Sequence, residues 1–346
     1  MKKGMAVLLC ALLVATLAGC GRPLTGTEPP KTIKIGISVY DQYDTFVSLL
    51  NERFDQFKRE KEQQTGVTIT VLREGAGGSQ VTQNNQVEAF IRDGCDIICV
   101  NLVDRTDAAM VIEKAEAANI PVVFFNRELV EEDLERWNKL YYVGAYALES
   151  GKIQGEIVAD RCRQNMAEVD INGDGILQYV MLEGEAGHQD AVVRTEYSVS
   201  TLIAEGYAVE RLEDEIANWS RAQAETKMAQ WLATHGGAIE VVFANNDDMA
   251  LGAIDALKKA NVERWPLVVG IDGTPVGMQA VREGTMTGTA LNDANGQAQA
   301  LMELAFSLAM GQPLPAEFTL QEGKYIRFPY KTVTAETLNL YEDFYK

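Results

Sequence analysis

The stretch TIKIGISVYDQYDTFVSLLNERFDQF, residues 32–57, decides the fold class. Its first nine residues form a run rich in β-branched residues, and the apolar residues after it recur at the spacing of one helix face. These residues are Phe46, Val47, Leu49, Leu50, Phe54 and Phe57. A strand followed by an amphipathic helix is one βα unit, the building block of a parallel sheet covered by helices.

The same alternation of strand and helix patterns runs along the rest of the chain. Further strand-like runs are VTITVL (67–72), DIICVNLV (96–103), PVVFFN (121–126) and LYYVGA (140–145). A helical stretch at 149–164 and the loop DINGDG (170–175) follow, and the series then restarts with ILQYVMLEGE (176–185), YAVERLED (207–214), IEVVFANND (239–247), PLVVGIDG (266–273) and MTGTALND (286–293). Two successive series predict an α/β protein with two doubly wound parallel-sheet domains.

Composition and charge limit the class of protein. The chain has 346 residues, of which 47 % are hydrophobic and 23 % charged, as expected for a folded globular protein of about two domains. Its formal net charge is −19. An excess of negative charge this large argues against nucleic acid or an anionic lipid surface as a partner.

The N-terminus has the features of an export signal. Lys2 and Lys3 precede an apolar run and then small residues, which predicts a signal peptide over residues 1–19. The sequence LAGC at 17–20 resembles a bacterial lipobox, so we expect lipidation of Cys20 and an extracytoplasmic protein anchored to the cell membrane. Residues 20–32, rich in Pro, Gly and Thr, are predicted to form a flexible tether.

Polar residues stand where the predicted strands end. Because ligands of such sheets bind at the carboxyl ends of the strands, these residues are candidates for a binding site. They are Asn126, His188, Asp190, Asn246, Asp247, Asp272 and Asn292. Asn and Asp are also common in ordinary turns, so the argument rests on their number.

The loop DINGDGILQY, residues 170–179, begins like the calcium loop of an EF-hand. Asp170, Asn172 and Asp174 occupy ligand positions, Gly175 stands at the obligatory glycine, and Ile176 and Gln178 follow as carbonyl and side-chain ligands. Position 12, however, is Met181, which cannot bind calcium. Either the stretch is a polar turn or its last ligand comes from elsewhere in the chain.

The chain resembles the galactose/glucose-binding protein family in several stretches. These are IGISVYDQYDTF, PVVFFNRE, YYVGA, DINGDG, GEAGHQDAVVRT, NWSRAQAETKMAQWL, IEVVFANND, GIDG and TALNDAN. The resemblance covers almost all of the chain beyond the signal peptide. It implies the periplasmic-binding-protein type 1 fold, in which three hinge strands join two lobes and the ligand lies in the cleft between them. The N-terminal lobe would comprise 33–144 and 292–328, and the C-terminal lobe 145–291 and 329–346.

The resemblance also implies which residues bind ligands. The sugar contacts would be Asp44, Phe46, Asn126, His188, Asp190, Arg194, Trp219, Asn246, Asp272 and Asn292. Glu240, in IEVVFANND, would complete a structural calcium site with Asp170, Asn172, Asp174, Ile176 and Gln178. Three residues beside the contacts, Arg127, Gln189 and Gly273, depart from the family pattern and are expected to alter the preference among hexoses.

These residue types suit a pyranose independently of the family. Phe46 and Trp219 would cover its two apolar faces, while carboxylates accept hydrogen bonds from its hydroxyls and Arg194 donates to them. A buried partner left unpaired would disfavour a sugar that lacks one hydroxyl.

The expected function is a monomeric receptor that captures D-galactose or D-glucose by hinge closure and presents it to the permease subunits of an ABC importer. A receptor feeding a chemoreceptor or sensor kinase, or one for another aldose, is an alternative. A glycosidase would use two of Asp44, Asp190 and Asp272, but they are better explained as hydroxyl acceptors, and no enzyme is expected. A transcription regulator of this fold is opposed by the export signal.

Overall fold

The computed structural model describes residues 32–345, so the predicted signal peptide, Cys20 and nearly all of the predicted tether lie outside the described residues. The described chain contains two six-stranded sheets. Each of the ten strand-like runs of the sequence forms a strand, β1 to β10. Within residues 32–345 no helix combines the length and apolar character that a membrane span requires.

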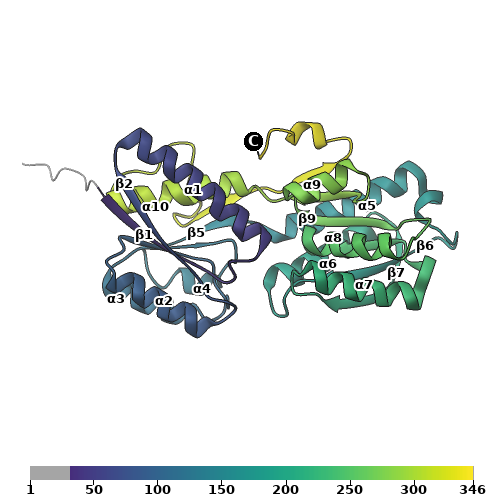
Figure 1. Ribbon diagram of the computed structural model, residues 1–346, viewed down its shortest axis with the longest axis horizontal. Coiled ribbons are helices and arrows are strands. Elements are labelled where there is room, and N and C mark those ends of the chain that lie inside the picture. The colour runs from purple at the N-terminus through teal and green to yellow at the C-terminus, as the bar shows by residue number, and fades with distance from the viewer. Residues whose placement is uncertain (1–31, 346) are drawn as a thin grey trace, which may run out of the picture. The chain divides into compact units, whose positions relative to one another are not determined.

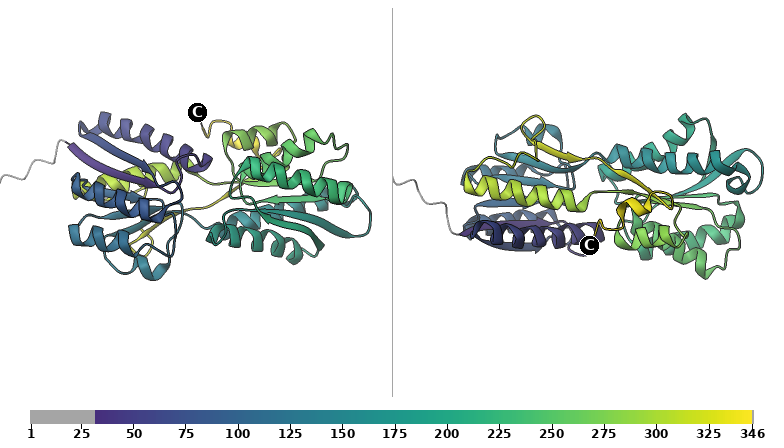
Figure 2. Two further views of the ribbon diagram at one scale, coloured as in Figure 1. Left: turned by 60° about the horizontal axis from the view of Figure 1, so that its bottom comes forward. Right: turned by 90° about the horizontal axis from the view of Figure 1, so that it is seen from above.

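The first sheet has the order β11-β5-β4-β3-β1-β2 and is parallel throughout. Its strands are β1 (Thr32–Val39), β2 (Thr68–Gly75), β3 (Ile97–Val100), β4 (Val122–Phe125), β5 (Leu140–Ala145) and β11 (Tyr325–Phe328). Helices α1 (Thr45–Thr65) and α10 (Ala294–Met310) cover one face, and α2 (Gln80–Arg92) and α3 (Ala109–Ala118) cover the other, as Figures 1 and 2 show. The short helix α4 (Glu131–Leu134) precedes β5. We call these elements the N-terminal lobe.

The second sheet has the order β12-β10-β9-β8-β6-β7, with β12 antiparallel to β10. Its strands are β6 (Ile176–Glu183), β7 (Ala208–Ile216), β8 (Val241–Ala244), β9 (Leu267–Asp272), β10 (Gly288–Leu291) and β12 (Lys331–Thr334). Helices α5 (Ala147–Val169) and α6 (Gln189–Ala204) pack on one face, and α7 (Arg221–His235), α8 (Asp247–Lys259) and α9 (Pro275–Arg282) on the other. With the 3₁₀ turns η1 (Gly236–Ala238) and η2 (Leu338–Tyr341), these elements form the C-terminal lobe.

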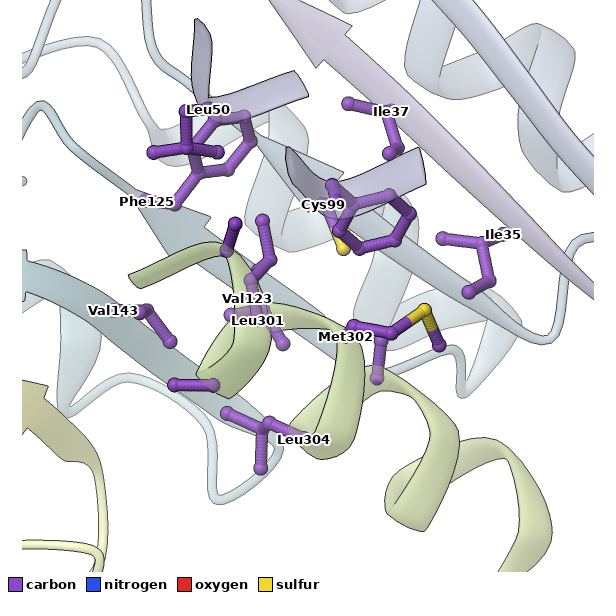
Figure 3. Close-up of a cluster of buried hydrophobic side chains, with 14 of the residues drawn as sticks. Ile35, Ile37, Leu50, Cys99, Val123, Phe125, Val143, Leu301, Met302 and Leu304 are labelled. Atoms are coloured by element: carbon purple, nitrogen blue, oxygen red, sulfur yellow. The ribbon is translucent and has the colours of Figure 1, made fainter. Parts of the chain in front are cut away.

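The buried core of the N-terminal lobe shows why the first βα unit folds as predicted. Ile35 and Ile37 of β1 point to the face where Leu50 of α1 and Leu301 of α10 pack, and Figure 3 shows this cluster. Alternate residues of a strand share one face, and residues three to four apart share one helix stripe, so the two patterns bury each other. α10 lies late in the sequence, yet it packs against β1, the first strand of the lobe.

The chain passes from one sheet to the other three times. The passages follow β5, follow β10, and separate β11 from β12. They occur where the family resemblance implies hinge strands, and the α/β class with two doubly wound sheets is confirmed. Local sequence patterns did not predict β11 or β12, two short strands separated only by Pro329 and Tyr330.

Candidate functional site

The strand ends of both lobes line one cavity. The N-terminal lobe contributes Tyr40, Asp44, Phe46, Asn126 and Arg127. The C-terminal lobe contributes His188, Asp190, Arg194, Trp219, Asn246 and Asp272. The structure thus brings together nine of the ten predicted contact residues. Asn292 does not line this cavity; its side chain is buried, and its Oδ1 accepts a hydrogen bond of 2.5 Å from Gln297 Nε2.

The residues of the N-terminal lobe are held by local hydrogen bonds. Asp44 is the N-cap of α1, and its Oδ1 accepts from the Val47 amide at 2.8 Å. Its other oxygen accepts from the Tyr40 hydroxyl at 2.6 Å. Phe46 follows in the first turn of the helix, with 5 % of its surface exposed. The cap therefore fixes where both Asp44 and Phe46 stand at the cavity wall.

Asn126 directly follows β4 and has a left-handed backbone, with φ of 60°. Asn tolerates this conformation better than most residues because its short side chain makes local hydrogen bonds. Here Asn126 Oδ1 accepts from Asn101 Nδ2 at 3.0 Å, and the Asn126 carbonyl accepts from the Tyr142 hydroxyl at 2.8 Å. The unusual turn is thus fixed from two sides.

α6 of the C-terminal lobe carries three candidate residues in its first two turns. His188 is the N-cap, and its Nδ1 accepts from the Asp190 amide at 3.1 Å. Burial, with the nearby Arg127 and Arg194, holds the pKa of His188 well below its usual range, so the ring is neutral at pH 7. A neutral ring with Nδ1 as acceptor leaves Nε2–H as a donor.

Arg194 is the best-anchored charged side chain of the cavity. It is 4 % exposed, and its guanidinium donates to the Asn245 carbonyl at 2.8 Å and to the Tyr330 hydroxyl at 3.0 Å. A third, longer contact of 3.3 Å reaches Asp190, one helical turn earlier. Burial raises the pKa of Asp190, although Arg194 opposes the shift. These contacts fix the orientation of the Arg194 guanidinium.

Trp219 lies in the loop between β7 and α7, in a left-handed conformation with φ of 61°. Its ring lies directly over Gly184, because a Cβ atom on Gly184 would stand only 2.1 Å from the Trp219 ring. The ring meets His188 edge to face with centroids 5.1 Å apart, and the Arg194 guanidinium lies 5.8 Å from its centroid. Gly184 is thus what permits this placement of the indole.

The Asp272 carboxylate differs from the other acids of the cavity. It ends β9, is 5 % exposed, and has φ of 114°. Among residues 32–345, no side chain or amide forms a hydrogen bond with its carboxylate oxygens. Burial raises its pKa well above the usual range, while Arg194 opposes the shift. Its oxygens open on the cavity, so a donor that enters there can pair with them.

Tyr40 and Arg127 also line the cavity, and Tyr330 supports Arg194 from behind, although none of the three was predicted as a sugar contact. Tyr40 ends its strand-like run as Asn126 does, so the rule that located the other strand ends applied to it. Arg127 follows Asn126 directly. Tyr330 stands in the passage between β11 and β12, and no local pattern points from there to α6.

The DINGDG loop and Glu240 come together in the C-terminal lobe, away from the cavity. Glu240 is 1 % exposed, and its carboxylate accepts from the amides of Ile171, Asn172 at 3.3 Å, and Gln178 at 3.0 Å. Asp174 Oδ2 accepts from the Asn172 and Gln178 side chains, both at 3.0 Å. The side-chain oxygens implied as ligands thus lie within one hydrogen-bonded cluster.

This cluster fits a cation in its donor types. Burial raises the pKa of Glu240, its backbone hydrogen bonds lower it, and the nearby Asp170 raises it further. No ion pair with Lys or Arg is found for Glu240 in the described chain. Within residues 32–345 no three His, Cys, Asp or Glu side chains converge on one point, so an ion here needs the oxygens of Asn172, Ile176 and Gln178 as well.

Comparison with known proteins identifies the family. The model of the family described as periplasmic binding protein domain matches residues 35–313. The D-galactose/methyl-galactoside binding periplasmic protein MglB of Haemophilus influenzae is 37 % identical over 88 % of this chain and 90 % of its own, and the xylitol-binding protein of Mycolicibacterium smegmatis is 28 % identical over 87 % and 79 %.

Among solved structures, an ABC transporter solute binding protein from Bacillus halodurans with bound myo-inositol is 28 % identical, with a TM-score of 0.76, over 92 % of this chain and 99 % of that one. The family match, the two sheets and the cavity where their strand ends meet agree with one another. The chain therefore belongs to the periplasmic binding protein family, a family of solute-binding proteins and not of enzymes.

Proposed function

We propose that this protein is an extracytoplasmic receptor for an aldohexose, D-galactose or D-glucose, and that it delivers the sugar to an ABC importer. The similarity to a galactose-binding protein at 37 % identity supports this choice of sugar. The bound myo-inositol of the Bacillus halodurans protein is also a six-membered ring bearing hydroxyls. The alternative in which the same receptor feeds a chemoreceptor or sensor kinase uses the same site.

The main support for a sugar ligand is the carboxylate of Asp272. Its buried carboxylate has no hydrogen-bond donor in the described chain and faces the cavity. A sugar hydroxyl is a neutral donor that fits between packed side chains, and its hydrogen bond to this oxygen would stabilise the ionised carboxylate and oppose the effect of burial on the pKa of Asp272. The sugar would thereby remove the cost of an unpaired buried acceptor.

The surrounding side chains supply the other interactions that a pyranose needs. Arg194 would donate to ring or hydroxyl oxygens, and Asp44, Asp190 and the Asn side chains would accept from hydroxyls or donate to them. Phe46 and Trp219 would cover the two apolar faces of the ring. We expect a hexose to enter when the two lobes part and to be enclosed when they close again, as a hinge permits.

Titration calorimetry of the protein with D-glucose, D-galactose, D-ribose, D-xylose and a disaccharide tests the proposal. We expect tight binding of one or both aldohexoses and weaker binding of the pentoses, which lack one hydroxymethyl group. If neither aldohexose bound while a pentose bound tightly, the assignment of the sugar would be wrong and the fold would stand.

We also propose a structural calcium ion held by Asp170, Asn172, Asp174, the Ile176 carbonyl, Gln178 and Glu240. The support is the oxygen-rich cluster and the buried carboxylate of Glu240 without a cationic partner. The ion would neutralise this carboxylate and tie the loop to β8, and a strand rather than a helix follows the loop, so no EF-hand-like opening is expected.

Anchoring through Cys20 is the third proposal, and it rests on the lipobox-like sequence at residues 17–20. Metabolic labelling of cells with a radioactive fatty acid tests it. The wild-type protein is expected to incorporate label and to sediment with membranes, and a Cys20→Ala variant to do neither. Equal labelling of the two proteins would refute the anchor.

A further inference from the structure

Arg127 extends from the N-terminal lobe to the C-terminal lobe. Its guanidinium donates to the Val103 carbonyl at 2.9 Å in its own lobe and to Glu185 Oε2 at 2.7 Å in the other. The guanidinium carbon also lies 3.4 Å from the centroid of the Tyr40 ring. Arg127 is 4 % exposed, although it begins in a loop after β4. Such burial of an arginine requires that its charge be paired.

The local structure fixes the direction of this side chain. Arg127 follows Asn126, whose left-handed backbone is held by Tyr142 and Asn101, as described above. The aromatic face of Tyr40 supports one side of the planar guanidinium, and the carbonyl of Val103 holds one of its nitrogens. The N-terminal lobe thus presents a preoriented cation, and only Glu185 is supplied by the partner lobe.

Arg127 also stands, with His188 and Asp190, between two spaces in the cleft. It lines the small cavity with Asp272 and, on its other side, a space of about 440 Å³ bordered by Arg105, Glu185 and Gly187. Loss of the Arg127–Glu185 ion pair would let water pass from the larger space into the small cavity. Exclusion of water strengthens every electrostatic interaction inside a cavity.

We propose that the Arg127–Glu185 ion pair is a latch between the lobes, which stabilises the closed arrangement by the same amount whichever sugar is bound. Arg127 is then a positioning residue that slows the opening of the lobes. It is not a sugar contact that discriminates among hexoses, as its departure from the family pattern had led us to expect. The effect on sugar release rests on the proposed function, whereas the effect on lobe separation does not.

The decisive variant is Glu185→Gln. The Glu185 side chain is 41 % exposed, so the substitution removes the charge without opening the core. Dissociation of radiolabelled D-galactose and of D-glucose is followed by dilution into unlabelled sugar. Removing the charge of the exposed partner of this pair acts mainly on the dissociation rate, and we expect both rates to rise by the same factor, roughly tenfold. High salt should raise the wild-type rate and leave that of the variant nearly unchanged.

Small-angle scattering of the sugar-free protein supplies the second measurement. With the latch removed, the lobes separate more readily, and we expect a larger radius of gyration for Glu185→Gln than for the wild type. This measurement remains decisive if the wild-type protein binds neither hexose, a result that would refute the proposed function alone.

Glu205→Gln is the matched control. Glu205 pairs with Arg163 at 2.6 Å, but both residues belong to the C-terminal lobe and are exposed. The control should change neither dissociation rate nor radius of gyration. Unequal factors for the two sugars would overturn the latch, because Arg127 would then act through the sugar. Dissociation rates and a radius of gyration equal to those of the wild type would also overturn it, as would slower dissociation.

Discussion

The two lobes present different chemistry to the same cavity. The N-terminal lobe contributes Asp44 and Phe46 from one helix start and Asn126 from one turn. Asp44 accepts a hydrogen bond from the Val47 amide, and Asn126 accepts one from Asn101. The C-terminal lobe contributes the buried charges Arg194 and Asp272. Arg127 of the N-terminal lobe is equally buried, but its charge is already paired with Glu185. Burial makes a polar group costly when unpaired and strong when paired. We therefore expect the C-terminal lobe to supply most of the binding free energy, and the N-terminal lobe mainly to close over the ligand.

The largest effect is expected for Trp219→Ala. The indole forms one wall of the cavity over Gly184 and contacts His188, so its loss removes a large apolar surface and admits water. Central aromatic residues of this kind cost more than about 2 kcal/mol when truncated. We expect the affinity for the preferred hexose to fall by roughly 100-fold or more in calorimetry. An affinity equal to that of the wild type would remove Trp219 from the site.

A paired test compares Asp272→Asn with Asp44→Asn. Hydrogen bonds to charged groups contribute about 1.5–3 kcal/mol, so loss of the Asp272 charge should weaken hexose binding by roughly 10- to 100-fold. Asp44 is less buried and already accepts from Tyr40 and Val47, so its variant should lose less affinity. Calorimetry and thermal unfolding of both variants measure the difference. If Asp44→Asn lost more affinity than Asp272→Asn, the lobes would have the opposite roles.

Calcium provides a test confined to the C-terminal lobe. The cluster around Glu240 lies away from the cavity, so an ion there should stabilise the fold by preferential binding to the native state. After treatment with EDTA, we expect the melting temperature to fall by several degrees and to recover on addition of calcium. The Glu240→Gln variant should show little response. Identical melting curves of the wild type with and without calcium would exclude the site.

The smallest effect concerns pH. Asp247 of α8 is fully buried, and its carboxylate accepts from the Thr274 amide at 2.7 Å and from the Thr289 hydroxyl at 2.6 Å. Burial raises its pKa to about 7, even though these hydrogen bonds lower it, and the nearby Asp248 raises it further. The folded state then holds a proton that the unfolded state, with a pKa near 4, has released.

Stability should therefore fall as pH rises from about 4 to 7 and level off above that range. Asp272 and Asp190, whose pKa values are also raised, act in the same direction. An Asp247→Asn variant should show a shallower fall in urea unfolding at several pH values, and Asp160→Asn, on the exposed part of α5, should follow the wild type. Equal slopes for Asp247→Asn and the wild type would contradict this explanation.

The strand ends show how far sequence reasoning reaches. The alternation of strand and helix patterns predicted all ten strands from β1 to β10, and the rule that parallel strand ends meet predicted that Asn126, Asn246 and Asp272 lie close together. Both inferences depend on local patterns and on one topological rule. Neither requires knowledge of which side chain contacts which.

The remaining features depend on long-range contacts that no local pattern records. Tyr330 supports Arg194 across 136 positions of the chain, and Glu185 faces Arg127 across 58. Asn292 ends its strand like the others, yet Gln297 of α10 binds its side chain instead of leaving it to the cavity. A partner from another element thus decided the environment of each of these side chains.

The position of Trp219 in the cavity wall has an optical consequence. The chain has four tryptophans, and only Trp219 lines the cavity, while Trp137, Trp231 and Trp265 pack against hydrophobic clusters within a single lobe. Its indole lies near the charge of Arg194, so any ligand that enters changes the field and the hydration around one fluorophore. The change in tryptophan emission on ligand binding should therefore come mainly from Trp219, so binding can be followed without an attached dye.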